Sequence, residues 1–391
     1  MADAVIVSAV RSAIGKKKGT LSATRTDDLL AHVLSAVVDR IKIAPAEIDD
    51  VICGCVTQIG EQGFNIARTA ALMAGFPVEV TGTTVNRQCG SSQQALHFAA
   101  MAVMSGQCDA VIAAGVESMS RIPMGMDAGM GLPGVAPALP FSSLFMEKHT
   151  FVPQHNSAEL VAEKWKISRR ECEELAMSSH QRAAAARESG RFKNEIVALK
   201  VKNPAGAEIT FEADEGIRPD TSLEKLASLG AVVKPDGVVT AGTASQISDG
   251  AAALIVMSAE KAKKLGLKPR AKVITTACAG VDPTMMLHGV IPATQKALQR
   301  AGLKKEDISL VEINEAFASV PLAWSKELDW KLDNVNVNGG AMALGHPLGA
   351  SGARLMTTLL HELERRDARY GLQTMCIGFG QATATIIDRK I

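Results

Sequence analysis

The sequence has few aromatic residues, almost no net charge and no long apolar run. Aromatic side chains make up only 4% of its 391 residues, whereas hydrophobic residues reach 47%, so we expect a core of alanine, valine, isoleucine, leucine and methionine. Forty-two basic residues balance 41 acidic ones, for a net charge of +1. This balance argues against bulk attraction to nucleic acid or to a membrane surface, although a local basic patch for phosphates stays open. The longest apolar stretches fall far below the ~20 residues of a membrane-spanning helix.

Cysteine is sparse, and its spacing suits neither a disulfide framework nor a metal site. Seven cysteines are present, an odd number that fits a reducing compartment. Cys53 and Cys55 stand too close together for a usual zinc pair, and we interpret them as small buried thiols in a strand. The N-terminus lacks the pattern of a signal peptide, and the last residues, 388–391, are not a peroxisomal address. We therefore expect a cytoplasmic protein that holds no metal.

One of the seven cysteines has unusual surroundings. Cys89 follows an extended apolar segment and precedes Gly90, Ser91 and Ser92, after which the pattern becomes helical. The thiol is therefore expected near a helix N-terminus, where unpaired N–H groups and the helix dipole favour a thiolate. The small residues leave room for a substrate to reach the sulfur. Taken alone, Cys89 could equally be a buried structural cysteine.

Three later segments carry residues that suit acyl transfer through a thioester. His346 is followed by Pro347, which suits the first turn of a helix. Cys376 begins a glycine-rich turn after an apolar strand, and Asn314 stands where a strand runs into a polar turn. Two turn-borne thiols, a histidine and an asparagine together form a set that is typical of covalent acyl chemistry. A satisfied core histidine is the alternative for His346 considered alone.

A faint internal repeat indicates a duplicated α/β unit. Segments 46–52 and 305–311 are both acidic turns that enter an apolar strand, and each is followed by a helical run and another strand. Two such βα halves would bring Cys89 and His346 to equivalent places across a pseudo-two-fold axis. Between the halves, 121–140 is predicted as loop, 157–166 and 168–190 as helices, and 201–211 as a hairpin. An insertion this long is expected to be functional.

The four motifs, in this order and at this spacing, resemble those of the thiolase family of acyl-CoA C-acyltransferases. The start at 4–15 and the segment 240–245 also match, so the resemblance covers nearly the whole chain. It implies an α/β fold of duplicated halves in five layers (α-β-α-β-α) with an inserted loop domain that binds coenzyme A. The implied domains are an N-terminal half of residues 1–119 plus 241–268, a loop domain of 120–240, and a C-terminal half of 269–391.

The resemblance also implies roles for the site residues. Cys89 would hold the acyl group as a thioester, and His346 would take its proton. Cys376 would act as acid and base at the α-carbon, and Asn314 would hold a water that helps His346 bind the enolate oxygen. The N–H groups of Cys89 and Gly378 would meet the acyl-enzyme oxygen. Coenzyme A enters as a substrate, so no cofactor is expected.

Weaker candidates concern substrate binding. By the resemblance, Arg218 would lie near the adenine nucleotide of coenzyme A and Ser245 near its pantetheine, with solvated surface and turn capping as the alternatives. Met286 would line the acyl pocket, although plain core packing explains a methionine there equally well. Glu315 is expected to orient His346 or neighbouring backbone, and His97 to be structural. The resemblance further implies a homodimer or homotetramer.

Two departures from the family pattern bear on activity and substrate. The C-terminal turn is usually Cys-x-Gly-Gly-Gly, but here Phe379 replaces the middle glycine. A positive φ at Phe379 would be strained, and its ring would reshape the site beside Cys376. The segment 152–159 lacks the His-Met-Gly that is common in biosynthetic acetoacetyl-CoA thiolases. This absence favours a degradative thiolase that acts on longer, branched or ring-derived chains.

Three alternative functions stay open at this point. The first is a biosynthetic acetoacetyl-CoA thiolase. The second is a ketosynthase-like condensing enzyme, against which Cys376 argues because such enzymes use a second histidine or an asparagine with their cysteine and histidine. The third is a non-catalytic acyl-CoA or lipid-binding protein, which only Phe379 favours.

Overall fold

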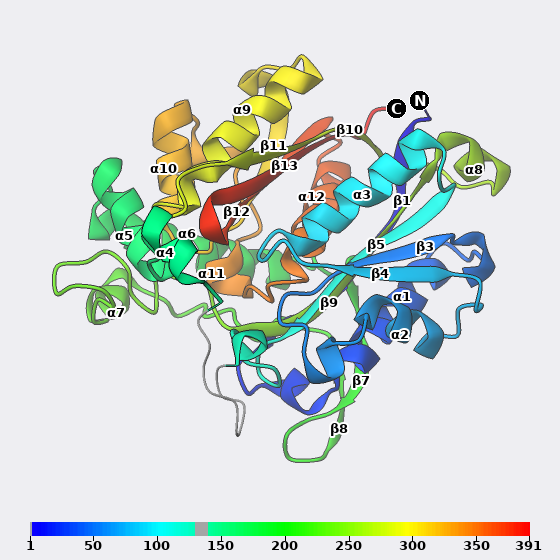
Figure 1. The fold of residues 1–391 in the computed structure, drawn as a ribbon, viewed down its shortest axis with the longest axis horizontal. Helices are drawn as coiled ribbons and strands as arrows, with labels where there is room; N and C mark the ends of the chain where they lie inside the picture. The colour runs from blue at the N-terminus through cyan, green and yellow to red at the C-terminus, as the bar shows by residue number, and fades with distance from the viewer. Residues whose placement is uncertain (1, 130–139) are drawn as a thin grey trace.

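The central sheet organises the whole molecule. A computed structural model describes residues 2–129 and 140–391, and Figure 1 shows a mixed α/β protein around one twisted sheet. Nine strands of the described residues form the main path of this sheet, in the order β11-β12-β13-β10-β1-β9-β5-β3-β4. Their bounds are β1 (Ala4–Ser12), β3 (Asp50–Gly54), β4 (Thr81–Val85), β5 (Ala110–Ser118), β9 (Ser248–Ser258), β10 (Ala271–Gly280), β11 (Ile308–Ile313), β12 (Tyr370–Ile377) and β13 (Gln381–Asp388). Two short strands, β2 (Gly15–Lys16) and β6 (Ile196–Val197), pair with β9 and β1.

The sheet consists of two halves with the same topology, as the internal repeat predicts. In the first half β3 pairs parallel with β5, and β9 pairs antiparallel with both β5 and β1. In the second half β11 pairs parallel with β12, and β13 pairs antiparallel with both β12 and β10. Only two residue pairs, Val5 with Lys272 and Ile6 with Ala271, join β1 to β10 between the halves. The predicted duplication is therefore present in the strand order and in the strand directions.

Helices form three further layers around the two halves. Two central helices, α3 (Ser91–Ser105) and α12 (Ser351–Arg365), share one buried cluster with strands of both halves (Figure 1). Outer helices α1 (Thr26–Asp39) and α2 (Ile66–Met73) cover the first half. Helices α9 (Val290–Ala301) and α10 (Ser319–Leu328) cover the second half. The order of layers is α-β-α-β-α, in agreement with the expected fold. The short helices α8 (Ala259–Lys264) and α11 (Ala341–Leu344) lie in connecting segments.

The two central helices pack closely because small residues face each other at their N-terminal ends. A Cβ on Gly352 would collide with the backbone N of Gln93, so α12 tolerates only glycine at this position. The backbone N–H of Ala353 donates a hydrogen bond to Ser92 Oγ at 2.9 Å. This contact fixes the start of α12 against the start of α3. The segment before each helix, which carries His346 or Cys89, therefore reaches the same region of the molecule.

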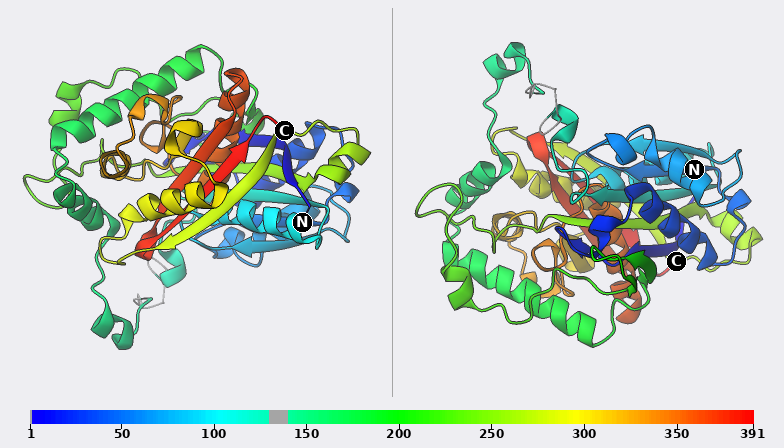
Figure 2. Two further views of the ribbon diagram at one scale, coloured as in Figure 1. Left: turned by 90° about the horizontal axis from the view of Figure 1, so that it is seen from above. Right: turned by 90° about the horizontal axis from the view of Figure 1, so that it is seen from below.

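The segment between the halves contains the predicted helices and hairpin. Its helices are α4 (Ser143–Lys148), α5 (Gln154–Lys164), α6 (Arg169–Glu188) and α7 (Leu223–Ala227), and β7 (Leu199–Lys202) pairs with β8 (Glu208–Phe211). Ser168 and Glu171 form the expected capping box of α6. Part of the predicted loop 121–140 lies outside the described residues, at 130–139, and the preceding part contains a short 3-10 turn. Figure 2 shows α4 projecting from the body of the molecule. The proposed boundaries of the loop domain, 120 and 240, stay a prediction.

No helix in the described ranges is long and apolar enough to cross a membrane.

Candidate active site

Cys89 lies where the sequence predicts it, two residues before the first residue of α3. Its side chain is buried, and burial raises the pKa of the thiol to about 11. Hydrogen bonds from the Gln154 side chain and from the backbone N–H of Gly378 act in the opposite direction and lower this pKa. The direction of this shift runs against the expected thiolate, because loss of solvent outweighs these hydrogen bonds. Cys89 needs a base to become a nucleophile.

His346 is held by hydrogen bonds on both ring nitrogens. Its Nδ1 lies 2.5 Å from Ser351 Oγ, and the Ser351 hydroxyl donates its own hydrogen to the carbonyl of Pro347. Ser351 can therefore only accept from His346, which places the ring hydrogen on Nδ1 and leaves a lone pair on Nε2. Burial, followed by the positive charge of Arg354, lowers the pKa of His346 to about 3. The imidazole is neutral at pH 7, and Nε2 carries the lone pair that can act as a base once it gives up the hydrogen bond from Asn314.

His346 lies further from the helix than its proline suggests. Pro347 begins a turn in which Ala350 and Ser351 donate backbone N–H groups to its carbonyl, and α12 begins at Ser351. The expectation that Pro347 occupies the first turn of the helix is therefore wrong. Because of this turn, the side chain of Ser351 at the start of α12 lies within hydrogen-bonding distance of the imidazole.

Asn314 directly follows β11 and contacts His346. Its Nδ2 group donates to His346 Nε2 at 3.2 Å. The Asn314 Oδ1 atom is buried and has no hydrogen-bond partner among the described residues. A buried acceptor of this kind is costly unless water or substrate satisfies it. The neighbouring Glu315 does not contact His346 but accepts hydrogen bonds from Ser179, Asn336 and the backbone of Met342.

Cys376 is the penultimate residue of β12, and its side chain is buried. Burial, and then the nearby Cys89 thiol, raises the pKa of Cys376 far above its usual value. Cys376 therefore stays a neutral thiol, which is the form that can give up a proton. The two thiols lie near each other although 287 positions separate them in the sequence, because Gly90 beside Cys89 packs on Ile377 beside Cys376.

Three segments that are far apart in the sequence pack against one another around the two thiols. Cys89 belongs to one buried cluster with Leu348, two residues after His346, and with Met375, the residue before Cys376. A Cβ on Gly378 would collide with Gln88 Oε1, and a Cβ on Gly90 would collide with Ile377. The turn after β12 therefore packs directly on the turn before α3, and glycine at both positions allows this close approach.

Phe379 occupies the left-handed region at φ 57° and ψ 33°, so the strain expected from replacing glycine is present. Its ring packs against two phenylalanines of the projecting segment, with centroid distances of 5.1 Å to Phe141 and 6.1 Å to Phe151. Phe141 also stacks on Phe145 at 4.7 Å. In a chain with ten phenylalanines, this aromatic cluster of Phe141, Phe145, Phe151 and Phe379 connects the projecting segment to the turn beside Cys376.

The weaker candidates are distributed around this centre. Met286 is buried in the same cluster as Cys376. Ser245 is half-buried and donates its backbone N–H to the carbonyl of Ala316, close to Asn314 in the sequence. Arg218 is exposed, and its backbone N–H donates to His180 Nδ1 on α6. His97 is buried and bonded to Thr385, in agreement with a structural role.

Sequence reasoning missed three residues at the site. Ser351 fixes the His346 tautomer, and Gln154 reaches Cys89 from the start of α5. Glu117 is buried at the end of β5 and accepts hydrogen bonds from Gly349 and from the backbone of Val56 and Thr57. Glu117 thereby ties the turn after His346 to the first half. A buried glutamate at the end of an apolar strand was the available signal, whereas nothing in the sequence pointed to Gln154.

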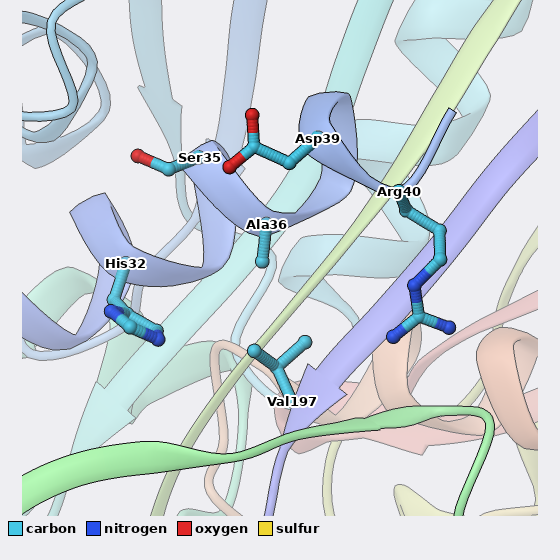
Figure 3. Close-up of a pocket in the computed structure, with 6 residues that line it drawn as sticks. All are labelled: His32, Ser35, Ala36, Asp39, Arg40 and Val197. Carbon is cyan, nitrogen blue, oxygen red and sulfur yellow. The ribbon is translucent and has the colours of Figure 1, made fainter. Parts of the chain in front are cut away.

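A separate surface pocket lies on α1, away from these residues. It has a volume of about 410 Å³, and Figure 3 shows the side chains of His32 and Arg40 on either side of Ala36. The residues that line it are His32, Ser35, Ala36, Asp39, Arg40 and Val197. None of them is a candidate from the sequence. In the described part of the chain, no cluster of three or more histidine, cysteine or acidic side chains could hold a metal ion, and independence from metals stays a prediction.

Comparison with known protein families shows which family this chain belongs to. The model of the thiolase N-terminal domain matches residues 4–260, and that of the thiolase C-terminal domain matches residues 267–389. The chain belongs to the thiolase family. In the sequence, the boundary between the two matched regions falls between β9 and β10. The chain passes from the first topological half to the second at this same place. The predicted family and the acyltransferase class of enzyme are confirmed.

Individual thiolases are similar over the full length. A steroid 3-ketoacyl-CoA thiolase of Mycobacterium tuberculosis is 48% identical over 392 residues, covering 100% of this chain and 95% of the relative. A 3-ketoacyl-CoA thiolase of Aeromonas salmonicida is 48% identical over 395 residues, with 100% of both chains covered. Among solved structures, the Bacillus anthracis acetyl-CoA acetyltransferase superposes with a TM-score of 0.91 at 41% identity, covering 99% of each chain. Human mitochondrial 3-ketoacyl-CoA thiolase also has a TM-score of 0.91, at 37% identity, covering 100% of this chain and 99% of that one.

Proposed function

We propose that this thiolase cleaves 3-ketoacyl-CoA with coenzyme A to give acetyl-CoA and an acyl-CoA shortened by two carbons, in the degradative direction. The observation that carries the proposal is the meeting of two buried thiols, Cys89 and Cys376, at one glycine-rich turn. The curated relatives named as 3-ketoacyl-CoA thiolases support the substrate class. The similarity to an acetyl-CoA acetyltransferase keeps the biosynthetic reaction as the second candidate.

The first half-reaction uses Cys89 and His346 together. His346 Nε2 takes the thiol proton as the sulfur attacks the 3-keto carbon, and the backbone N–H of Gly378 lies close enough to the sulfur to stabilise the oxygen that becomes negative. The bond between C2 and C3 then breaks, which leaves the acyl group on Cys89 and the enolate of acetyl-CoA. Protonated His346 and a water on Asn314 Oδ1 would bind the enolate oxygen.

Cys376 completes both half-reactions. Its neutral thiol gives a proton to C2 of the enolate, and acetyl-CoA leaves. In the second half-reaction Cys376, now a thiolate, takes the proton of the incoming coenzyme A thiol. The coenzyme A sulfur attacks the Cys89 thioester, and Cys89 leaves as a thiolate that recovers a proton from His346. The raised pKa of Cys376 keeps its thiol protonated until the enolate forms, as this step requires.

A thiolysis assay across 3-ketoacyl-CoA lengths tests the proposal. We expect coenzyme A-dependent loss of the 3-ketoacyl thioester, with EDTA without effect, and higher kcat/KM for long or ring-bearing chains than for acetoacetyl-CoA. A preference for acetoacetyl-CoA alone would favour the biosynthetic candidate. Failure to cleave any 3-ketoacyl-CoA would overturn the proposal.

The reactivity of Cys89 should depend steeply on pH. Because burial raises its pKa to about 11, the thiolate is a small fraction at neutral pH, and this fraction grows about tenfold per pH unit. Brief iodoacetamide labelling, followed by mass spectrometry of the Cys89 peptide, should therefore give rates that still rise between pH 8 and pH 10. A plateau below pH 8 would show that the thiol is already ionised.

Phe379→Gly should change substrate range more than turnover. Glycine removes the left-handed strain of about 1–2 kcal/mol, and loss of the ring opens the space beside Cys376. We expect kcat/KM to rise for branched or bulky acyl chains while acetoacetyl-CoA turnover is retained. A collapse of turnover would show instead that the aromatic cluster holds the catalytic turn in place.

We further propose that coenzyme A binds along the inserted segment 120–240, with Arg218 near its phosphates or adenine and Ser245 near its pantetheine. The exposed position of Arg218 and the contact between the Ser245 and Ala316 backbones support this placement. Arg218→Ala should raise the KM for coenzyme A about 5- to 10-fold with little change in kcat, as expected for loss of one charged contact at a partly exposed site. A fall in kcat at unchanged KM would contradict the placement.

A homodimer is the assembly that we propose. Strand β4 lies at one end of the sheet path, and Phe64 beside it is fully exposed with a left-handed φ of 54°. A sheet edge that pairs with no further strand of the described residues, next to an exposed aromatic ring, suits pairing with a second copy. Sedimentation should give about twice the chain mass of 41.1 kDa, and a monomer at micromolar concentration would contradict the proposal.

We also propose a cytoplasmic location. All seven cysteines, which lie in the described residues, are free thiols, and this fits a reducing compartment. Cell fractionation should recover the protein with cytoplasmic markers, and recovery with exported proteins would refute the location.

A further inference from the structure

Gln154 places a side-chain amide beside the nucleophile. It is the first residue of α5, in the inserted segment, and its side chain lies close enough to the Cys89 sulfur to lower the pKa of the thiol. The position that a Cβ on Gly378 would take lies 3.1 Å from Gln154 Nε2. The amide therefore lies at the same turn whose backbone N–H groups face the thiol. None of the roles described above for the reaction uses it.

The start of α5 is tied to the catalytic turn by a chain of hydrogen bonds. Ser157 Oγ donates to the carbonyl of Thr284, and Thr284 Oγ1 donates to the carbonyl of Thr150 at 3.0 Å. At the other end of this loop, the backbone N–H of Val281 donates to the carbonyl of Gly380 at 2.7 Å. The loop 281–284 thus holds the segment before and after Gln154 against the turn that follows Cys376. Contacts of the residues before and after Gln154 therefore hold its amide in position, in addition to the contact of the amide itself.

We propose that Gln154 is a further catalytic residue, whose Nε2 hydrogen stabilises the negative charge on the Cys89 sulfur when His346 removes the proton and again when the acyl group leaves. This inference rests on the proposed function, since it assigns Gln154 to the same reaction. A neutral amide suits a buried nucleophile, because it donates a hydrogen bond to the charged sulfur without adding a second buried charge. The inserted segment then contributes to the chemistry as well as to the binding of coenzyme A.

The ionisation of Cys89 tests the proposal without requiring turnover. The variants are Gln154→Met, which keeps the length and removes the donor, and Gln154→Glu, which keeps the shape and adds a negative charge. Gln94→Met is the matched control, because Gln94 is a buried glutamine on α3 whose amide contacts Cys278 and not Cys89. Each protein is labelled briefly with iodoacetamide between pH 7 and pH 10, and the Cys89 peptide is quantified by mass spectrometry.

We expect Gln154→Met to label Cys89 about tenfold more slowly at each pH, equivalent to a rise of about one unit in its pKa, as for loss of one hydrogen bond to a charged group. Gln154→Glu should label more slowly still, and Gln94→Met should match the parent protein. Circular dichroism confirms that each variant is folded. Unchanged labelling in both Gln154 variants would overturn the inference.

Steady-state kinetics separates this inference from the proposed function. With the best 3-ketoacyl-CoA substrate, Gln154→Met should lower kcat about tenfold and leave the KM for coenzyme A unchanged. If the parent protein cleaves substrate and both Gln154 variants label and turn over normally, the inference fails and the proposed function stands. If the parent protein cleaves no 3-ketoacyl-CoA but labelling still slows in the variants, the proposed function fails, while the contact between Gln154 and the thiolate holds.

Discussion

Cys89→Ala is expected to abolish acyl transfer while the protein stays folded. The acyl group would have no sulfur to bind, and the other nearby thiol, Cys376, is a neutral buried group with a far higher pKa. Removal of a nucleophile typically lowers kcat by about 10⁶-fold. The fold should tolerate the change, because alanine fills most of the volume of a buried cysteine at a cost of about 1 kcal/mol.

Two measurements check this prediction. Thiolysis should fall to the background rate of the assay, and the thermal midpoint should stay within a few degrees of that of the parent protein. Cys53→Ala is the control, because Cys53 is also a buried cysteine in the first half but lies on β3 in the outer core cluster. Retention of more than a hundredth of the parent activity in Cys89→Ala would exclude Cys89 as the acyl carrier.

Cys376→Ala is expected to separate acylation from carbon–carbon chemistry. Transfer of an acyl group from acyl-CoA to Cys89 needs the nucleophile, His346 as base and one oxyanion site. Cleavage of the C2–C3 bond also needs a proton donor at C2, and Cys376 supplies it in the proposed mechanism. Loss of one positioned acid lowers the rate about 10²–10⁴-fold.

The variant should therefore accept an acetyl group from acetyl-CoA at Cys89 but should cleave 3-ketoacyl-CoA at least 100-fold more slowly. Exchange of labelled coenzyme A into acetyl-CoA measures the first step, and loss of the 3-ketoacyl thioester measures the second. Equal losses in the two assays would refute the division of roles. Cys172→Ala is the matched control, since Cys172 is buried in the same cluster as Cys376 but lies on α6.

The sequence predicted the fold well because the relevant signals are local and repeated. The acidic turns before β3 and β11, and the helical runs that became α3 and α12, mark equivalent elements in each half. Once two such units are recognised, their pairing follows from packing rules. Strand β9 is the exception in sequence order, because only the family resemblance assigned residues 241–268 to the first half, where β9 pairs with β1 and β5.

Candidate site residues could be proposed from the sequence, but their electrostatics could not. Cys89, His346, Asn314 and Cys376 stand in distinct motifs, whereas the pKa of each thiol depends on burial that no motif encodes. The helix N-terminus suggested a thiolate, but burial of the Cys89 thiol shifts its pKa in the opposite direction. Gln154 was missed for a related reason. Its contact joins two segments that are 65 positions apart, and glutamine at the start of a helix carries no signal of its own.

The effect of Phe379, a departure from the family motif, depends on tertiary contacts. The sequence predicted strain at a positive φ, and the observed φ of 57° confirms it. What the sequence could not show is that Phe141 and Phe151 pack on the strained residue and that Phe145 stacks on Phe141. Tertiary packing of this kind can maintain a left-handed phenylalanine where local preference would choose glycine.

A single-turnover experiment tests the central claim most directly. The enzyme is mixed with an equal amount of a 3-ketoacyl-CoA in the absence of free coenzyme A, quenched in acid, and digested for mass spectrometry. The mechanism predicts release of acetyl-CoA together with an acyl group, shortened by two carbons, on the peptide that contains Cys89. Release of acetyl-CoA with Cys89 unmodified, or an acyl group found only on another cysteine, would contradict it.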